Sequence, residues 1–139
     1  MTEIELFVAY AQTTFLADLP QGRVEIRVNG FHPSLDQWLA LNGWTTWGFV
    51  TAWNPASVCL TPEENQRRHH ALMLAVSAMG LPAWPGRGTP DSGSWTPEES
   101  LFVPGLTEPD AVGLGRQFGQ LAVVWGQIGK SAQLLSCAS

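Results

Sequence analysis

The chain has 139 residues and a formal net charge of −5 at pH 7, and 45% of its residues are hydrophobic against 14% charged. This length suits one domain with an ordinary core, and the composition excludes a disordered tail. The acidic balance and the scattered arginines argue against broad nucleic-acid binding, which needs clustered positive charge. A small anionic ligand remains compatible with this charge.

Hydropathy and cysteine usage indicate the cellular compartment of the protein. No apolar stretch reaches the roughly 18 to 20 residues that a membrane-spanning helix needs. The start Met-Thr-Glu-Ile-Glu is acidic where a secretory signal would be basic. Cys59 and Cys137 lie far apart without a CxxC spacing, so neither a disulfide framework nor a zinc knuckle is indicated. We therefore expect a cytoplasmic protein with reduced thiols and no membrane association.

The first elements in chain order are a helix and a hairpin. Thr2 and Glu5 form a capping box ahead of apolar residues at helical spacing, which predicts a helix over residues 3–11. Residues 13–19 and 23–28 flank a Pro-Gln-Gly turn, and apolar and charged residues alternate in the second segment. This pattern predicts a hairpin with one solvent-facing side.

The middle of the chain carries the clearest signals. Ser34 and Gln37 form another capping box and predict a helix of about two turns. Residues 46–53 are apolar or small on both alternating faces, which a strand tolerates when both faces are covered, so we expect this strand in the centre of the sheet. Thr61, with proline next and glutamate three residues on, begins the best-defined helix, which ends near Gly80.

The last third is predicted to hold three strands and a helix around one loop. The loop is residues 85–97, which are rich in Gly, Pro and Ser and are expected to be mobile. The other elements are strands over residues 81–84, 99–103 and 121–125 and a helix capped by Thr107. The element order predicts an α+β fold: a single layered domain over residues 1–139, with a mixed, mostly antiparallel sheet and helices mainly on one face.

Motifs for the common cofactors are missing. There is no phosphate-binding loop, and Gly113, Gly115 and Gly119 have the wrong spacing for one, so these glycines are expected to serve packing. The sequence also lacks a GxSxG elbow and an HExxH motif. His69 and His70 are adjacent on a helix and point about 100° apart, which does not suit a paired metal site. We therefore predict no cofactor and no metal.

Two asparagines flank the connection between the central strand and the long helix. Asn65 shares the inward stripe of the helix with Leu72 and Val76, and Asn54 ends the strand before a short loop. Both amides are expected at the carboxyl end of the strand, near the positive end of the helix, where they would suit a ligand. Taken singly, each asparagine is as readily explained by a turn or a loop brace, and we favour that explanation for each alone.

Other polar residues could lie near Asn54 and Asn65 at this end of the sheet. Glu98 and Glu99 follow Trp95 beside the expected loop, and a partly buried carboxylate there could do acid–base work. A helix cap or a solvated loop is the plainer role. Gln120 opens the last strand, where its amide could turn inward to the same end of the sheet or cover the edge.

At these residues the chain resembles an uncharacterised bacterial family, domain of unknown function 3293. The matching strings are Phe49-Val50-Thr51-Ala52-Trp53-Asn54-Pro55, Glu64-Asn65, Trp95 with Glu98-Glu99-Ser100-Leu101-Phe102-Val103, and Phe118-Gly119-Gln120-Leu121-Ala122-Val123. The resemblance implies that Asn54, Asn65, Glu98 and Gln120 form the family's polar set. The family pattern has proline where this chain has Glu99, so Glu98 is the better candidate acid. No activity follows from the resemblance.

Two hypotheses follow, and the sequence leaves open whether the protein is an enzyme. The first is a small-molecule-binding domain, with an anionic or nucleotide-like ligand read by Asn54 and Asn65. Glu98 is its acid–base candidate, and Trp53 or Trp95 its stacking wall. Arg67 or Arg68 is the expected neighbour of an anionic ligand. The alternative is a module that binds another protein, or a second copy of itself, through a patch drawn from the seven tryptophans.

Overall fold

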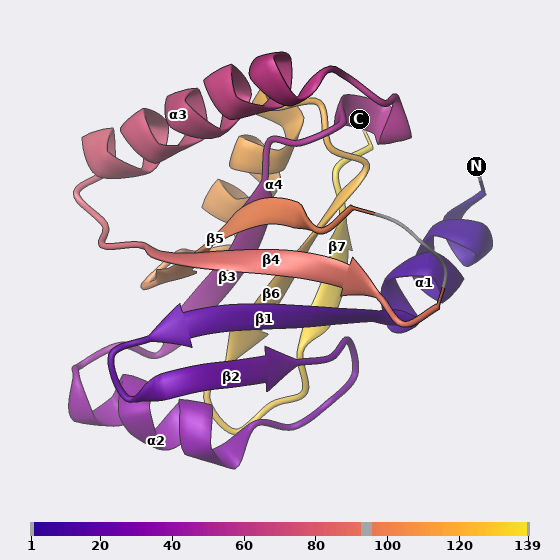
Figure 1. Ribbon diagram of the computed structural model, residues 1–139. Helices are drawn as coiled ribbons and strands as arrows, with labels where there is room; N and C mark the ends of the chain where they lie inside the picture. The colour runs from indigo at the N-terminus through magenta and orange to yellow at the C-terminus, as the bar shows by residue number, and fades with distance from the viewer. Residues whose placement is uncertain (1, 93–95, 139) are drawn as a thin grey trace.

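The computed structural model describes residues 2–92 and 96–138 (Figure 1). Within them the chain forms four helices, seven strands and one tight turn. The helices are α1 (Glu3–Ala11), α2 (Pro33–Leu41), α3 (Pro62–Ala78) and α4 (Glu108–Gln117), and the tight turn is η1 (Pro55–Ser57). The strands are β1 (Thr13–Leu19), β2 (Gly22–Ile26), β3 (Thr46–Thr51), β4 (Trp84–Pro90), β5 (Glu98–Pro104), β6 (Ala122–Gln127) and β7 (Gln133–Ser136).

The described strands form one sheet in the order β2-β1-β4-β5-β3-β6-β7, and neighbouring strands pair antiparallel throughout. The sheet curls strongly, so that β1 and β4 cross the view in Figure 1 while β3 and β6 run steeply behind them. The predicted α+β class is confirmed, with antiparallel pairing replacing the expected mixture. The hairpin of β1 and β2 is also confirmed, with Ala17 opposite Val24.

Two apolar cores lie on the two faces of this sheet. On one face, α3 and α4 pack over Val50, Ala52 and Leu101. On the other, α2 packs with Trp47 and Phe49. Strand β3 contributes to both cores because its side chains alternate between the faces. The prediction that it lies centrally is confirmed, since β5 and β6 flank it, and the two cores cover both of its faces.

Close backbone approaches set the shape of the central strands. A Cβ atom on Gly126 of β6 would lie 2.2 Å from the Trp47 ring, and one on Gly115 of α4 would lie 2.3 Å from the Cys137 Sγ. Glycine therefore lets the Trp47 indole and helix α4 lie directly against the sheet. The interpretation of Gly115 as a packing glycine agrees with this contact.

Two expectations about local structure are wrong. Residues 84–90 form strand β4 between β1 and β5, where a loop over 85–97 was expected. Its glycines look like loop residues, but Gly86 lies under the Phe49 ring, where any Cβ would clash. Helix α2 begins at Pro33 without a side-chain cap, so Ser34 and Gln37 do not form the expected capping box. Proline suits a first helical position because its φ is already helical.

Helix α1 lies at one end of the sheet, and its residues are exposed except for Leu6 and Tyr10, which are half-buried. In the described ranges, no helix combines the length and the apolar character needed to cross a membrane.

Candidate functional site

The chain leaves β3 through an unusual turn. Asn54, Ala56 and Ser57 all adopt left-handed conformations, with φ of 44°, 52° and 63°. Such conformations cost non-glycine residues roughly 1 to 3 kcal/mol each and persist only where the surroundings impose them. Ala56 is held by a hydrogen bond from its N–H to the Gly119 carbonyl at 2.8 Å. The turn is therefore fixed from outside its own sequence.

Asn54 and Asn65 hold each other across this turn. The Asn54 N–H donates to Asn65 Oδ1 at 2.9 Å, and Asn65 Nδ2 donates to Asn54 Oδ1 at 2.9 Å. Asn54 Oδ1 accepts a second bond from the Leu60 N–H at 3.0 Å. Asn65 is 2% exposed. The expected proximity of the two amides is confirmed, and their polar atoms are largely occupied by each other and by the loop backbone.

Glu98 joins the pair at the first residue of β5. Its Oε2 accepts a hydrogen bond from Asn54 Nδ2 at 3.0 Å. Burial raises the pKa of this carboxyl group above its usual value, and the bond from Asn54 opposes the rise in part. The pKa of Tyr10, on α1, is raised first by burial and then by the negative charge of Glu98. A partly desolvated carboxylate thus lies between the strand end and α1.

Gln120 and Arg68 bind the carbonyl groups of the same strand end. Gln120 Nε2 donates to the Trp53 carbonyl at 3.0 Å, so its amide turns inward. Arg68 Nε donates to the Ala52 carbonyl at 2.7 Å, and Arg68 Nη2 donates to the Phe118 carbonyl. These bonds tie the end of β3 to α3 and to the end of α4.

Trp53, the last residue before the turn, is buried at the candidate site. Trp53 is 9% exposed, and its Nε1 has no hydrogen-bond partner within the described ranges. A buried indole N–H without a partner is rare and marks a place where a polar atom would be stabilising. Trp95 lies outside the described residues.

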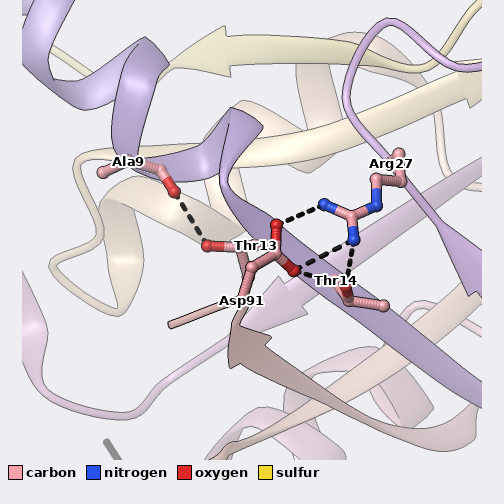
Figure 2. A network of polar contacts seen from close by, with 5 residues as sticks. All are labelled: Ala9, Thr13, Thr14, Arg27 and Asp91. Carbon is pink, nitrogen blue, oxygen red and sulfur yellow. Dashed lines mark hydrogen bonds and ion pairs between the residues drawn. The ribbon is translucent and has the colours of Figure 1, made fainter. Parts of the chain in front are cut away.

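The connection that leads to Glu98 is anchored at its start. Figure 2 shows the guanidinium group of Arg27 facing the carboxylate of Asp91, with Thr14 beside both. The Arg27 nitrogens lie 2.6 and 3.0 Å from the two Asp91 oxygens, and the Thr14 hydroxyl donates to Asp91 at 2.7 Å. The bond from Arg27 is the main cause that lowers the pKa of Asp91. The anchor fixes the chain where it leaves β4.

The histidines of the α3 pair belong to no group of three potential metal ligands within the described ranges. His69 Nε2 lies 3.9 Å from a Glu99 oxygen, and burial lowers the pKa of His69, which favours its neutral form. Among residues 2–92 and 96–138, no cluster of three potential metal ligands occurs.

A comparison with family models finds a match to "Protein of unknown function (DUF3293)" over residues 50–123, more than half of the chain. The chain belongs to this family. The residues of the chain that match the DUF3293 model include all four polar residues, from Asn54 to Gln120. They do not include α1, which carries Tyr10. No curated protein and no solved structure matches the chain significantly. The function is therefore unknown.

In this DUF3293 chain, the polar set and Arg68 were predicted from the sequence as candidate site residues, whereas Tyr10 was not. Arg68 follows Asn65 by three residues on α3, so helical spacing already placed the two on one side. Tyr10 carried no such signal, because its contact with the strand end depends on how α1 docks. The assembled groups can offer the Glu98 carboxylate and the Trp53 indole N–H to a ligand.

Proposed function

We propose that the protein is a small-molecule-binding domain whose site surrounds Glu98 at the carboxyl end of β3. The observation that carries this proposal is the Glu98 carboxylate, which is partly buried and accepts only one hydrogen bond from the described part of the chain. Desolvating a carboxylate is costly, and folded proteins keep such groups mainly where they are paired or functional. Asn54 supplies one donor, and a ligand supplies the others.

The remaining polar residues take supporting roles in this proposal. Asn54 orients Glu98 through its Nδ2 atom and is itself fixed by the buried Asn65. Gln120 fixes the backbone of Trp53, whose indole N–H, without a partner in the described ranges, is a further donor for the ligand. Trp95, three residues before Glu98 in sequence, is the proposed stacking wall. Asn65 acts as a positioning residue, because its side chain is out of reach of a ligand.

Glu98 also suits acid–base chemistry if the domain converts its ligand. A carboxyl group whose pKa is raised by burial exchanges protons closer to neutral pH than an exposed one does. In this proposal Glu98 is the catalytic acid or base, and Asn54 donates to its Oε2 atom and leaves Oε1 toward the ligand. Both cysteines are unpaired, which supports the further proposal that the protein works in the cytoplasm.

A specific observation favours the second candidate, a protein-binding module. The indoles of Trp38, Trp44 and Trp84 pack against one another, with ring centroids 5.3 to 6.0 Å apart, and all three are half-buried. Aromatic clusters with an exposed side are common at protein interfaces. In that case the polar set around Glu98 would serve only to brace the loops.

A thermal-shift screen of small metabolites on the wild type and on Glu98→Gln tests the first candidate. The expected result is a compound that raises the melting temperature of the wild type and has no effect on Glu98→Gln. The neighbouring Glu99→Gln is the matched control, since Glu99 is exposed and accepts no bond from Asn54. The proposal fails if no compound stabilises the wild type, or if both glutamine variants respond as the wild type does.

A further inference from the structure

A second candidate binding site lies between α3 and α4. It is an open hollow of about 460 Å³ lined by Leu60, Glu64, Arg67, Arg68, Ala71, Gln117 and Phe118. This volume falls within the range of about 300 to 1,000 Å³ that is usual for small-molecule sites. None of the four residues of the polar set lines it, so the hollow is separate from the Glu98 site.

The charge of this hollow is positive. Arg67 and Arg68 both line it, against the single carboxylate of Glu64. That carboxylate is turned toward the helix start, where its Oε1 accepts a hydrogen bond from the Thr61 hydroxyl at 3.1 Å. In the described parts of the chain, no carboxylate lies within 4.0 Å of the Arg68 guanidinium group. The positive charge of Arg68 is therefore not neutralised by the residues that surround it there.

Arg68 is also held in place before any ligand arrives. Its Nε and Nη2 atoms donate to the carbonyl oxygens of Ala52 and Phe118, which fixes the plane of the guanidinium group. A guanidinium group carries five N–H donors, so others are left for an acceptor on a ligand. A fixed guanidinium group loses little conformational freedom on binding and matches the planar geometry of a carboxylate or the oxygens of a phosphate.

The other lining residues indicate what the anion is attached to. Leu60, Ala71 and Phe118 give the hollow an apolar side, and the Gln117 amide adds a neutral polar group. We infer that the hollow between α3 and α4 binds a small organic anion, a carboxylate or phosphate ester with an apolar part, through Arg68 and Arg67. The inference goes beyond the function proposed for Glu98, because the two sites share no lining residue.

Ala71 offers a way to test the charge without disturbing the fold. It is exposed on α3 and lines the hollow one turn from Arg67 and Arg68. Glutamate introduced at this position reaches both arginines at helical spacing and competes with a bound anion, while the carbonyl bonds of Arg68 stay intact. Ala71→Gln has nearly the same size and no charge, so it is the matched control.

The experiment is calorimetric titration with phenyl phosphate, benzoate and the neutral benzyl alcohol at low ionic strength. We expect at least one of the two anions to bind. Comparing the affinities for phenyl phosphate and benzoate distinguishes a phosphate ligand from a carboxylate ligand. Benzyl alcohol should not bind. Ala71→Glu should weaken anion binding by about tenfold or more, and Ala71→Gln by less than about threefold. Arg67→Gln is the second variant and should also weaken binding.

Three results would overturn the inference. One is the failure of both anions to bind at millimolar concentrations, and another is an equal loss in Ala71→Glu and Ala71→Gln, which would make shape the cause. The third is loss of anion binding in Glu98→Gln, which would place the anion at the Glu98 site. Glu98→Gln should leave anion binding unchanged. The anion titration and the thermal-shift screen therefore test the hollow and the Glu98 site separately, and either proposal can fail without the other.

Discussion

The backbone N–H of Asn54 donates to the side-chain oxygen of Asn65, while the Asn65 amide donates back to the side-chain oxygen of Asn54, each at 2.9 Å. This reciprocal pair joins the end of β3 to the first turn of α3 and holds Asn54 in a left-handed conformation. The same Asn54 side chain then donates to Glu98. Asn65 thus positions Glu98 through Asn54.

Replacing Asn65 should show how strongly this pair holds the turn. Asn65→Leu leaves the half-buried Asn54 N–H and Oδ1 without their Asn65 partners, so the free energy of unfolding should fall by roughly 1 to 3 kcal/mol. Denaturant unfolding measures the change. The exposed neighbour Gln66 is the control, and Gln66→Leu should stay within about 0.5 kcal/mol of the wild type. Equal stability of Asn65→Leu and wild type would contradict the bracing role.

The cap of α3 gives a second test. The Thr61 hydroxyl accepts the N–H of Glu64 at 3.2 Å. Thr61→Ala removes this acceptor and should cost about 0.5 to 2 kcal/mol of stability, whereas Thr61→Ser keeps the hydroxyl and should cost less. An unchanged denaturant midpoint for Thr61→Ala would mean that the cap adds nothing to stability.

Two glycines of α4 should respond in opposite directions to alanine. Gly113 has open space at the Cβ position, so Gly113→Ala should stabilise the protein by about 0.5 to 1 kcal/mol through helix propensity. A Cβ on Gly115 would meet Cys137 and Val123, so Gly115→Ala should destabilise it by about 1 to 3 kcal/mol. Thermal unfolding of the two variants checks the signs, and a stabilised Gly115→Ala would contradict the close packing of α4 against Cys137 and Val123.

The sequence was informative where local chemistry decides the structure. The cap at Thr61, the two-sided apolar run of β3 and the short connection between Asn54 and Asn65 each follow from neighbouring residues. These features were enough to predict that Asn54 and Asn65 lie together at one end of the sheet. For Gln120 the residues left two orientations open, and only the family resemblance joined it to the set. Arg67 or Arg68 was also expected beside an anionic ligand.

The rest depended on contacts between residues far apart in the chain. Strand β4 looks like a loop because Gly86 has no side chain, and the reason for that glycine is the Phe49 ring on another strand. The hydrogen bond of Tyr10 to the Ala122 carbonyl spans most of the chain and leaves no local pattern. Likewise, the hollow beside Arg68 exists only because α3 and α4 pack side by side on the sheet.

The raised pKa of Glu98 predicts a pH dependence of stability. A carboxyl group with a higher pKa in the folded chain binds more protons when folded, so it lowers the free energy of unfolding as pH rises from its usual value of 4.5 through the raised pKa. The glutamine of the Glu98→Gln variant does not titrate. The stability of the wild type relative to Glu98→Gln should therefore fall over this pH window and level off above it.

Denaturant unfolding of both proteins at a series of pH values measures this difference, and other carboxyl groups cancel in the comparison. Glu99→Gln provides the reference for an exposed glutamate at the next position. If the stability of the wild type relative to Glu98→Gln instead rises with pH, the folded protein lowers the pKa of Glu98. That outcome would remove the electrostatic argument for a desolvated acid at this site.

The indole N–H of Trp53 reports most directly on a small molecule bound at the end of β3. The seven tryptophans give separate indole signals in a ¹H–¹⁵N correlation spectrum, and Trp53→Phe assigns the one that belongs to Trp53. A compound selected by the thermal-shift screen should move this signal in the wild type and leave it in place in Glu98→Gln. Shifts confined to Trp38, Trp44 and Trp84, with the Trp53 signal unmoved, would contradict the claim and favour the protein-binding module.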